Sequence, residues 1–290
     1  MCTKAFFYVI LYKEVYKIMR YNDKYKQKPK GLDESKPKFY EEEKPDENVV
    51  CGRNAVLELL RSGRSVDKLF IKKGGIEGSL IVIIGEAKTR NIPIVEVQRE
   101  KLDELAMGVI HQGVIAMAAA KEYVSIDDIL RIAEERCEKP FIVIADGISD
   151  PHNLGAIIRN CDGAGVHGLI IPKRRSAGLT AVTAKSSAGA IEHLAIAKVA
   201  NVSNTILELK KKGLWIVGCE AGGDSYDSID YDMPLALVLG SEGEGISDIV
   251  TKNCDFIASI PMMGKVNSLN VSCAAAIIMF EASKRRRIKN

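Results

Sequence analysis

Residues 141–172, FIVIADGISDPHNLGAIIRNCDGAGVHGLIIP, decide the fold because two continuous apolar runs flank a segment of helical periodicity. The runs Phe141–Ala145 and Gly168–Pro172 lack polar alternation, which is typical of strands buried on both faces. Between them, the apolar side chains from Leu154 to Cys161 recur at helical spacing. A strand, a helix and a second strand in this order predict a parallel sheet covered by helices.

The same alternation continues to the end of the chain. Further apolar runs predict strands at 214–218, 235–239 and 256–260. Residues 207–212 lie within an expected helix, and a closing helix is expected at about 269–286. We therefore predict that residues 140–290 form an α/β domain with a mostly parallel sheet.

A smaller α/β unit is expected before this domain, at residues 49–123. The expected helices are 53–63, 80–90 and 101–107, and the expected strands are 68–72, 94–97 and 113–119. Residues 124–139 are predicted to form a helix that links the two units. Residues 1–48 are polar, basic at first and then acidic, and are predicted to be a flexible charged extension.

The composition is that of a globular protein with a nearly even charge balance. Hydrophobic residues make up 47% and charged residues 27% of the 290 residues, and the formal net charge is +3. This slight basic excess permits an anionic partner but is too weak to imply one.

The seven cysteines and four histidines favour neither a disulfide framework nor a metal site. The cysteines are odd in number and form no C-x-x-C pair, and the histidines lack metal-ligand spacing. We therefore expect no metal, and a reducing cytoplasm as the location. The apolar stretch Ala5–Tyr12 is too short to span a bilayer, so no membrane association is expected.

Three loops hold most of the polar residues that packing alone does not require. In a parallel α/β sheet, ligands bind at the carboxyl ends of the strands. The first loop, residues 146–155, leads into a helix on which Arg159 points away from the apolar stripe, on roughly the same side as His152. Either residue alone is read most simply as a surface residue, but the other two loops favour a site.

The second loop, residues 240–246, follows a buried strand with the glycine order G-x-x-G-x-G. This order is not the dinucleotide fingerprint, and no lysine completes a phosphate-binding loop, which argues against a nucleotide-binding oxidoreductase. Glycines let the backbone approach a ligand such as a nucleoside closely. In the same loop, Glu242 could hold a cation or a hydroxyl proton.

The third loop, residues 260–272, ends in a cluster of polar side chains just before a very apolar helix. Either Ser268 or Asn270 could cap that helix. Capping explains one polar residue but not all four of Asn267, Ser268, Asn270 and Ser272, so the cluster favours a binding role.

Taken together and in this order, the three loops resemble the signature motifs of the SpoU/TrmH branch of the SPOUT methyltransferase superfamily. The matching stretches are DPHNLGAIIRNCDGAGV, LALVLGSEGEGIS and IPMMGKVNSLNVSCAAAI. Residues 49–120, which include CGRNAVLELL and HQGVIA, also resemble the N-terminal substrate-binding domain of that family. Within the branch, the chain most resembles guanosine 2′-O-methyltransferases of 23S ribosomal RNA.

The resemblance implies a ribosomal-protein-like (L30e-like) substrate-binding domain and a SPOUT domain with a deep trefoil knot, a rare exception to the unknotted rule. It implies that S-adenosylmethionine binds in the knot and that the sites lie at the interface of a homodimer. The implied cofactor-binding residues are Gly240, Ile260, Met262 and Leu269. The implied catalytic and substrate-binding residues are Asn153, Arg159, Glu242, Ser268 and Asn270.

The implied reaction is transfer of a methyl group to a ribose 2′-hydroxyl of structured RNA. In the family the arginine that matches Arg159 is proposed as the general base, yet a guanidinium normally stays protonated, with a pKa above about 12. Arg159 therefore either occupies a site that disfavours its charge or orients the hydroxyl and a phosphate.

Two other functions remain open at this point. One is methylation of a transfer RNA ribose, because the target nucleotide is not written in the sequence. The other is a catalytically silent or resistance-type protein of the same fold that binds ribosomal RNA. Intact Arg159, Glu242, Ser268 and Asn270 argue against a silent protein.

Overall fold

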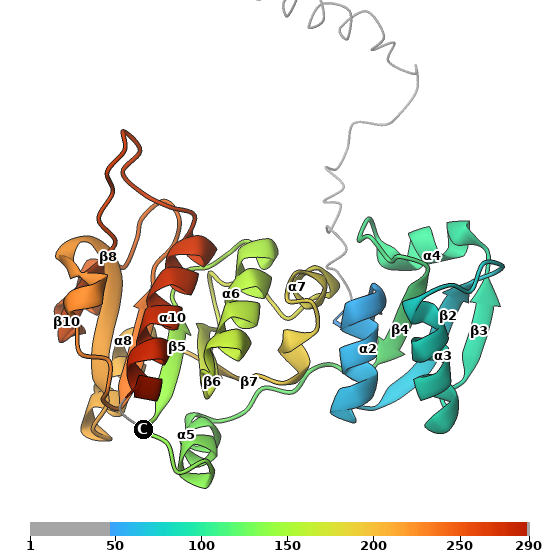
Figure 1. The fold of residues 1–290 in the computed structure, drawn as a ribbon, viewed down its shortest axis with the longest axis horizontal. Helices are drawn as coiled ribbons and strands as arrows, with labels where there is room; N and C mark the ends of the chain where they lie inside the picture. The colour runs from blue at the N-terminus through green and yellow to red at the C-terminus, as the bar shows by residue number, and fades with distance from the viewer. Residues whose placement is uncertain (1–46, 289–290) are drawn as a thin grey trace, which may run out of the picture. The chain divides into compact units, whose positions relative to one another are not determined.

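The structure, a computed structural model, describes residues 47–288 of the chain. The predicted flexible extension, residues 1–48, falls almost wholly outside these residues. Two sheets organise the described part, one of four strands and one of six (Figure 1).

The four-stranded sheet comes first in the chain and has the strand order β1-β4-β2-β3. Strand β4 runs antiparallel to β1 and β2, whereas β2 and β3 are parallel. Its elements are β1 (Val49–Cys51), α2 (Arg53–Ser62), β2 (Val66–Lys72), α3 (Ser79–Thr89), β3 (Ile94–Val97), α4 (Arg99–Ala106) and β4 (Val114–Ala118). Gly63 ends α2 in the left-handed conformation, as the sequence predicts.

Helices cover both faces of this sheet. Leu59 of α2 and Ile83 of α3 pack against one face, next to Leu69 of β2. Leu102 of α4 packs against the other face, next to Ile115 of β4. The sequence predicts this α/β unit correctly, but it does not identify β1 as a separate strand.

The six-stranded sheet is parallel throughout and has the order β10-β8-β9-β5-β6-β7. This confirms the predicted α/β fold with a mostly parallel sheet. Its strands are β5 (Phe141–Ala145), β6 (Gly168–Pro172), β7 (Ala195–Val199), β8 (Trp215–Ser225), β9 (Leu235–Leu239) and β10 (Phe256–Ser259). Its helices are α5 (Ile126–Glu135), α6 (Pro151–Ala164), α7 (Ala181–Ser186), α8 (Val202–Lys211), α9 (Asp248–Asn253) and α10 (Val271–Ile288).

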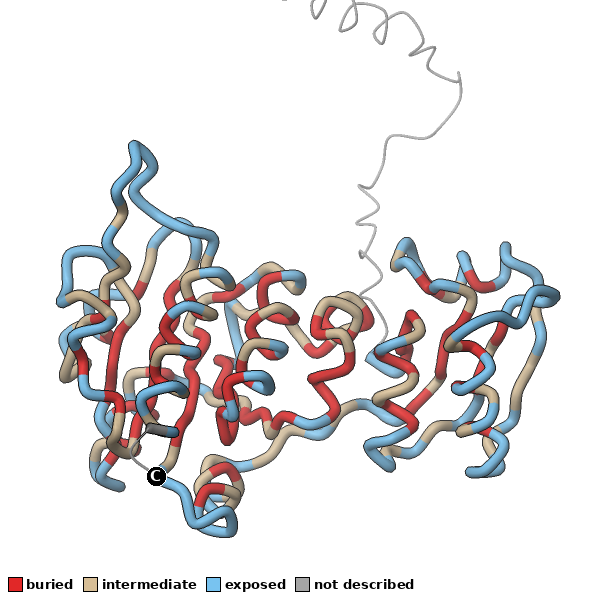
Figure 2. The backbone as a smooth tube through the Cα atoms, viewed as in Figure 1, coloured by how far each residue is buried: buried red, intermediate tan, exposed pale blue. Residues whose placement is uncertain are grey.

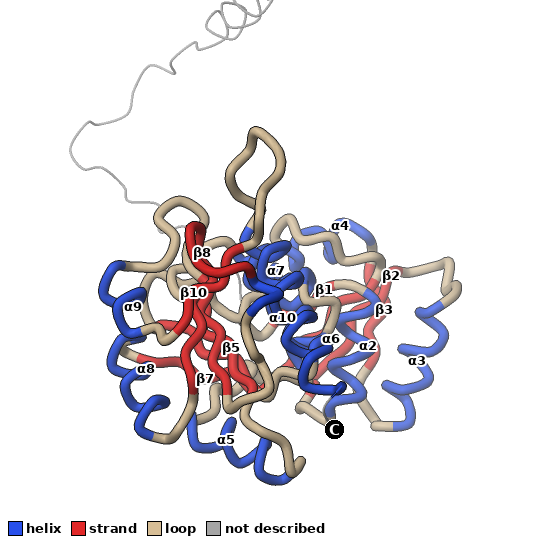
Figure 3. Tube along the Cα trace, turned by 60° about the vertical axis from the view of Figure 1, so that its left-hand side comes forward, coloured by secondary structure: helices blue, strands red, loops and turns tan. Residues whose placement is uncertain are grey.

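Alternate side chains of the central strands enter two separate apolar cores. Phe141 and Val143 of β5 face α6 and α10, whereas Ile142 and Ile144 face α5, α8 and α9. The sheet consequently lies between two helical layers (Figure 3). Strands β5, β6 and β9 are buried along their whole length (Figure 2). A continuous apolar run is required here because neither face of the strand meets water.

Helix α5, which the sequence predicts as a linker, also belongs to one of these layers. Its Ser125 N-cap accepts a hydrogen bond from the Asp128 backbone at 3.1 Å, and Asp128 bonds back to the Ser125 backbone at 2.9 Å. Ile129 is fully buried among residues of the six-stranded sheet. A Cβ on Gly168 would lie 2.6 Å from the Ile129 side chain, so helix and strand approach closely at that point.

Two further results bear on the expectations above. No helix within residues 47–288 is both long and apolar enough to cross a membrane. The trefoil knot implied by the resemblance stays a prediction.

We expect Ile129→Ala to lower the free energy of unfolding by about 2–5 kcal/mol, because it leaves a cavity in a closed core. The measurement is chemical denaturation, with Glu134→Ala, an exposed change on the same helix, as the control. If α5 were only a linker, the two variants would unfold at the same denaturant concentration as the unchanged protein.

Candidate functional site

Three loops meet at the carboxyl edge of the parallel sheet, where β5, β9 and β10 end. Strands β5 and β9 are neighbours, and the Asp146 backbone amide donates to the Leu239 carbonyl at 2.8 Å just beyond them. The first loop leads into α6, the second carries the glycine-rich turn, and the third leads into α10. Sequence reasoning predicts these same three loops.

One carboxylate oxygen holds the three loops together. Glu242 Oε1, from the second loop, accepts hydrogen bonds from Asn153 Nδ2 at 2.7 Å and from Asn270 Nδ2 at 2.9 Å. Asn270 Nδ2 also donates to Asn153 Oδ1 at 3.0 Å. Glu242 Oε2 has no hydrogen-bond partner among the described residues. We call this arrangement the amide–carboxylate cluster.

Asn270 also fixes the beginning of α10. Its Oδ1 accepts from the Ser272 backbone at 2.9 Å and from the Ser272 hydroxyl at 2.6 Å. The predicted capping role is therefore present, but it uses only the oxygen of the Asn270 amide. The Asn270 amide nitrogen is therefore available to donate within the amide–carboxylate cluster. One side chain thus links the start of α10 to the other two loops.

The glycine-rich turn is closed by its own backbone. Ser241 and Gly245 exchange two backbone hydrogen bonds of 3.0 Å, and Glu220 Oε2 accepts from the Ile246 backbone at 2.9 Å. A Cβ on Gly240 would collide with the Gly245 carbonyl group, whereas a Cβ on Gly243 would meet nothing within 4 Å. Glycine is thus required at position 240 by the close approach of two backbone segments.

A cavity of about 440 Å³ opens beside this turn. It brings together all four residues expected to bind a cofactor, together with Ser268: Gly240, Ile260, Met262, Ser268 and Leu269. Cys219 and Glu220, in the middle of β8, also line it, and sequence reasoning did not single them out. The available signal was a carboxylate that directly follows the run LWIVGC, residues 214–219.

A second cavity, of about 240 Å³, lies on the other side of the cluster. Residues 147–150 and Asn153 from the first loop line it, together with residues 241–244 and Val271. Both cavities are lined by Ser241, Glu242, Gly243, Glu244 and Val271. The two spaces therefore adjoin along the glycine-rich turn, and Glu242 is the shared residue that belongs to the amide–carboxylate cluster.

Arg159 and Asn270 line neither cavity, but Asn270 belongs to the amide–carboxylate cluster and Arg159 does not. Arg159 is exposed on α6 and makes no hydrogen bond or ion pair with any residue in the range 47–288. Six residues separate it from Asn153, and at about 100° per residue the two side chains point in directions about 120° apart. His152 is exposed as well and contacts the Ser186 hydroxyl at 3.0 Å.

Burial raises the pKa values of two groups around the site. Burial raises the pKa of the Cys219 thiol to about 12, so this thiol stays neutral and is a poor nucleophile. Burial also raises the pKa of the Asp146 carboxyl, and the nearby Arg175 opposes that shift. Within the described range, no three His, Cys, Asp or Glu side chains gather where they could hold one metal ion.

Comparison with known families agrees with this geometry. Residues 140–280 match the SpoU rRNA Methylase family, and residues 49–124 match the domain described as RNA 2′-O ribose methyltransferase substrate binding. The two matches cover the six-stranded and the four-stranded sheet, respectively.

Similar proteins extend over nearly the same range. The TrmH family tRNA/rRNA methyltransferase YacO of Bacillus subtilis is 47% identical over 240 residues, which cover 82% of this chain and 96% of YacO. A TrmH family tRNA/rRNA methyltransferase of Staphylococcus haemolyticus is 44% identical over 239 residues, 82% of this chain and 96% of its own.

Solved structures show the same likeness. The SpoU methyltransferase AviRb from Streptomyces viridochromogenes, in complex with the cofactor AdoMet, has a TM-score of 0.69 at 25% identity and covers 83% of this chain and 91% of its own. An AdoMet-bound rRNA methyltransferase from Sinorhizobium meliloti has a TM-score of 0.67 at 25% identity, over 81% and 86% of the two chains.

A parallel α/β sheet whose strand-end loops line two adjoining cavities is typical of proteins that bind small ligands at the carboxyl edge of the sheet. The sequence likeness specifies this class further. The chain belongs to the SpoU/TrmH family of RNA methyltransferases.

We expect Gly240→Ala to weaken binding of S-adenosylmethionine, which two of these solved relatives hold, by about five- to 150-fold. The added methyl group collides with the Gly245 backbone, and such overpacking typically costs about 1–3 kcal/mol. Isothermal titration calorimetry gives the two affinities. Gly243→Ala, in the same turn but in open space, is the matched control, and equal affinities for both variants would contradict the assignment of this cavity.

Proposed function

We propose that this protein transfers a methyl group from S-adenosylmethionine to a ribose 2′-hydroxyl of RNA, at a guanosine of 23S ribosomal RNA. The observation that carries the proposal is the position of Glu242 between two adjoining cavities. The description of the matched family as an rRNA methylase and the Sinorhizobium meliloti rRNA methyltransferase support ribosomal RNA. The guanosine rests on the motif resemblance.

The larger cavity fits the cofactor. Its volume of about 440 Å³ lies within the range of about 300–1,000 Å³ for small-molecule pockets. Ile260, Met262 and Leu269 offer apolar surface, and the backbone around Gly240 offers amides and carbonyls at close range. When bound there, S-adenosylmethionine supplies a methyl group that is already activated on a positively charged sulfur.

The smaller cavity is the proposed place of the target ribose, with Glu242 between it and the cofactor. Asn153 and Asn270 fix one carboxylate oxygen, which leaves Oε2 to accept a hydrogen bond from the 2′-hydroxyl. As the oxygen–methyl bond forms and the sulfur–methyl bond breaks, the hydroxyl proton leaves toward Glu242 or solvent. Ser268, in the adjoining cavity, is proposed to position the hydroxyl or the cofactor loop. Such alignment is the main contribution this reaction needs from the protein.

Arg159 is proposed to act on the site of a second subunit. Arg159 and Gly163 lie on one side of α6, and a Cβ on Gly163 would lie 3.3 Å from the Phe280 ring of α10. Phe280 and Ile277 are 45% and 37% exposed, so this side presents apolar surface that a second copy of the chain would cover. In that homodimer, Arg159 reaches the partner's ribose-binding cavity and orients the hydroxyl and a phosphate.

The two α/β units divide the work in this proposal. Residues 49–123 bind RNA, residues 124–139 join the units, and residues 140–290 bind the cofactor and carry out the reaction. The match of residues 49–124 to a substrate-binding domain supports this division. We place the enzyme in the cytoplasm, where its RNA substrate is made.

The test of the function is a map of 2′-O-methylated nucleotides in ribosomal and transfer RNA after treatment with the purified protein and S-adenosylmethionine. The proposal expects one new methylated guanosine in 23S ribosomal RNA. A new methyl group only in transfer RNA would show that transfer RNA, and not ribosomal RNA, is the substrate. No new methyl group in either RNA would overturn the proposed activity.

We expect Arg159→Ala to reduce methyl transfer by about 100-fold or more, because misplaced reactants lose most of the benefit of alignment. Because Arg159 lines neither of the two cavities at the strand ends, the affinity for S-adenosylmethionine should stay unchanged. Transfer of a radiolabelled methyl group and calorimetry measure the two quantities. Full activity of this variant would refute the role of Arg159.

Mixed dimers separate action on the partner's site from action within one chain. Arg159→Ala and Glu242→Gln homodimers should each be inactive, whereas random mixing of the two chains should restore about a quarter of normal activity. After random mixing, half of all dimers contain one chain of each variant. One of the two sites in such a dimer is intact. No recovery on mixing would show that Arg159 acts on its own chain.

A further inference from the structure

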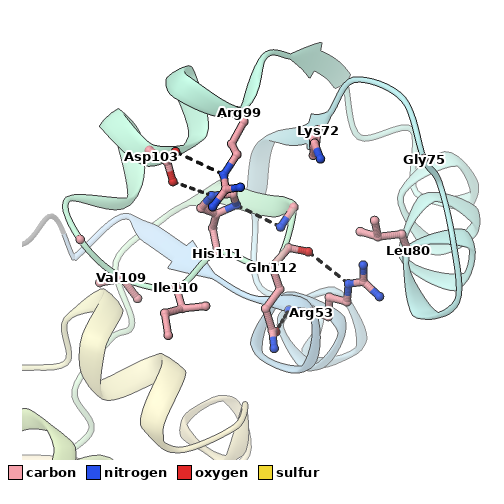
Figure 4. A pocket seen from close by; sticks show the side chains of 12 residues that line it. Arg53, Lys72, Gly75, Leu80, Arg99, Asp103, Val109, Ile110, His111 and Gln112 are labelled. Atoms are coloured by element: carbon pink, nitrogen blue, oxygen red, sulfur yellow. Dashed lines mark hydrogen bonds and ion pairs between the residues drawn. The ribbon is translucent and has the colours of Figure 1, made fainter.

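The substrate-binding sheet carries a separate cleft of about 660 Å³, away from the loops described above. Figure 4 shows its lining side chains, most of which come from α2, β2, α3, α4 and the loop before β4. The residues used below are Arg53, Lys72, Leu80, Arg99, Asp103 and residues 109–112. No residue of the amide–carboxylate cluster lines this cleft.

Asp103, the only carboxylate that residues 47–288 bring to this cleft, is already paired. It lies 3.6 Å from Arg99 and 3.0 Å from His111 Nε2 (Figure 4). His111 Nδ1 accepts a hydrogen bond from the Gly113 backbone at 3.0 Å, so the hydrogen of the ring lies on Nε2 and is donated to Asp103. Because Asp103 already has these two partners, it does not neutralise the positive charges of Arg53 and Lys72.

Arg53 and Lys72 retain donors that face no partner. Arg53 Nε donates to the Gln112 carbonyl at 3.1 Å, which fixes the direction of the guanidinium group. Its two terminal nitrogens and Lys72 Nζ make no hydrogen bond or ion pair with residues 47–288. Two cations thus line the same cleft with at least five free N–H donors between them.

Part of the lining is apolar. Ile110 is 73% exposed at the cleft and lies near Val109, whereas Leu80, on the other side of the cleft, is buried (Figure 4). The loop that follows β2 includes Gly74 and Gly75, where an added Cβ would meet nothing within 4 Å. The same cleft thus offers an exposed isoleucine to a flat apolar group and two unpaired cations to an anion.

We propose that this cleft binds an unpaired segment of the RNA substrate, with phosphates on Arg53 and Lys72 and a base against Ile110. The proposal rests on the proposed function and adds the place where RNA is gripped outside the reaction site. Unpaired RNA fits because its bases can turn out onto apolar side chains, whereas a duplex keeps its bases stacked inside. The cleft volume also matches groups the size of a nucleotide rather than a helix.

The test uses the full chain and fluorescence anisotropy with a labelled oligouridine of about 12 nucleotides. Lys72→Gln should weaken binding about three- to tenfold and lower the slope of log affinity against log salt by about 0.7, the value for one phosphate contact. Lys88→Gln, an exposed lysine of α3 outside the cleft, is the matched control and should change neither quantity. Equal effects of the two variants would overturn the proposal.

A second variant tests the base contact without changing charge. Ile110→Ala should weaken binding of the single strand, leave the salt slope unchanged, and have no effect on a duplex of the same length. An unchanged affinity for the single strand, or an equal loss for the duplex, would contradict a base contact at Ile110.

Two further readouts separate this inference from the proposed function. With 23S ribosomal RNA as substrate, Lys72→Gln should raise KM while kcat and the affinity for S-adenosylmethionine stay unchanged. If the chain transfers no methyl group at all, the oligonucleotide measurements still decide whether the cleft binds RNA. If methyl transfer is normal but Lys72→Gln behaves as Lys88→Gln does, only the inference about the cleft fails.

Discussion

The site depends on hydrogen bonds to a single carboxylate oxygen, Glu242 Oε1. The two amides that bond to it come from the starts of α6 and α10, which are more than a hundred residues apart in the sequence. A hydrogen bond to an ionised acceptor is roughly twice as strong as one between neutral groups, so this contact is well suited to hold three loops in register. The two cavities share Glu242 as a wall, and their shapes are therefore coupled.

Much of the architecture could be predicted because its causes are local. Phe141–Ala145 and Leu235–Leu239 are apolar at every position, and a parallel strand between two helical layers requires this. Strand β7 and helix α7 were not predicted, because they are short and carry polar residues without clear periodicity. Their positions follow from packing: a Cβ on Gly155 would lie 2.7 Å from the Thr183 carbonyl oxygen, so α6 and α7 touch through a glycine.

The site shows the same division between local and distant causes. Polar residues at strand ends indicated the three loops, and Gly240, Ile260, Met262 and Leu269 do line one cavity. The sequence could not show that Asn270 serves two partners, since that depends on a contact with Glu242 formed only on folding. Nor could it show that Arg159 points away from the cavities of its own chain. The cleft around Lys72 could not be predicted from the sequence because its residues come from four separate elements and the loop before β4.

The two backbone bonds between Ser241 and Gly245 have a consequence for ligand selection. The turn is already ordered before a ligand arrives, so little conformational entropy remains to be lost on binding there. As a wall of the proposed cofactor cavity, such a turn would discriminate among adenosyl compounds by steric fit. Selectivity at this wall is therefore built in when the chain folds.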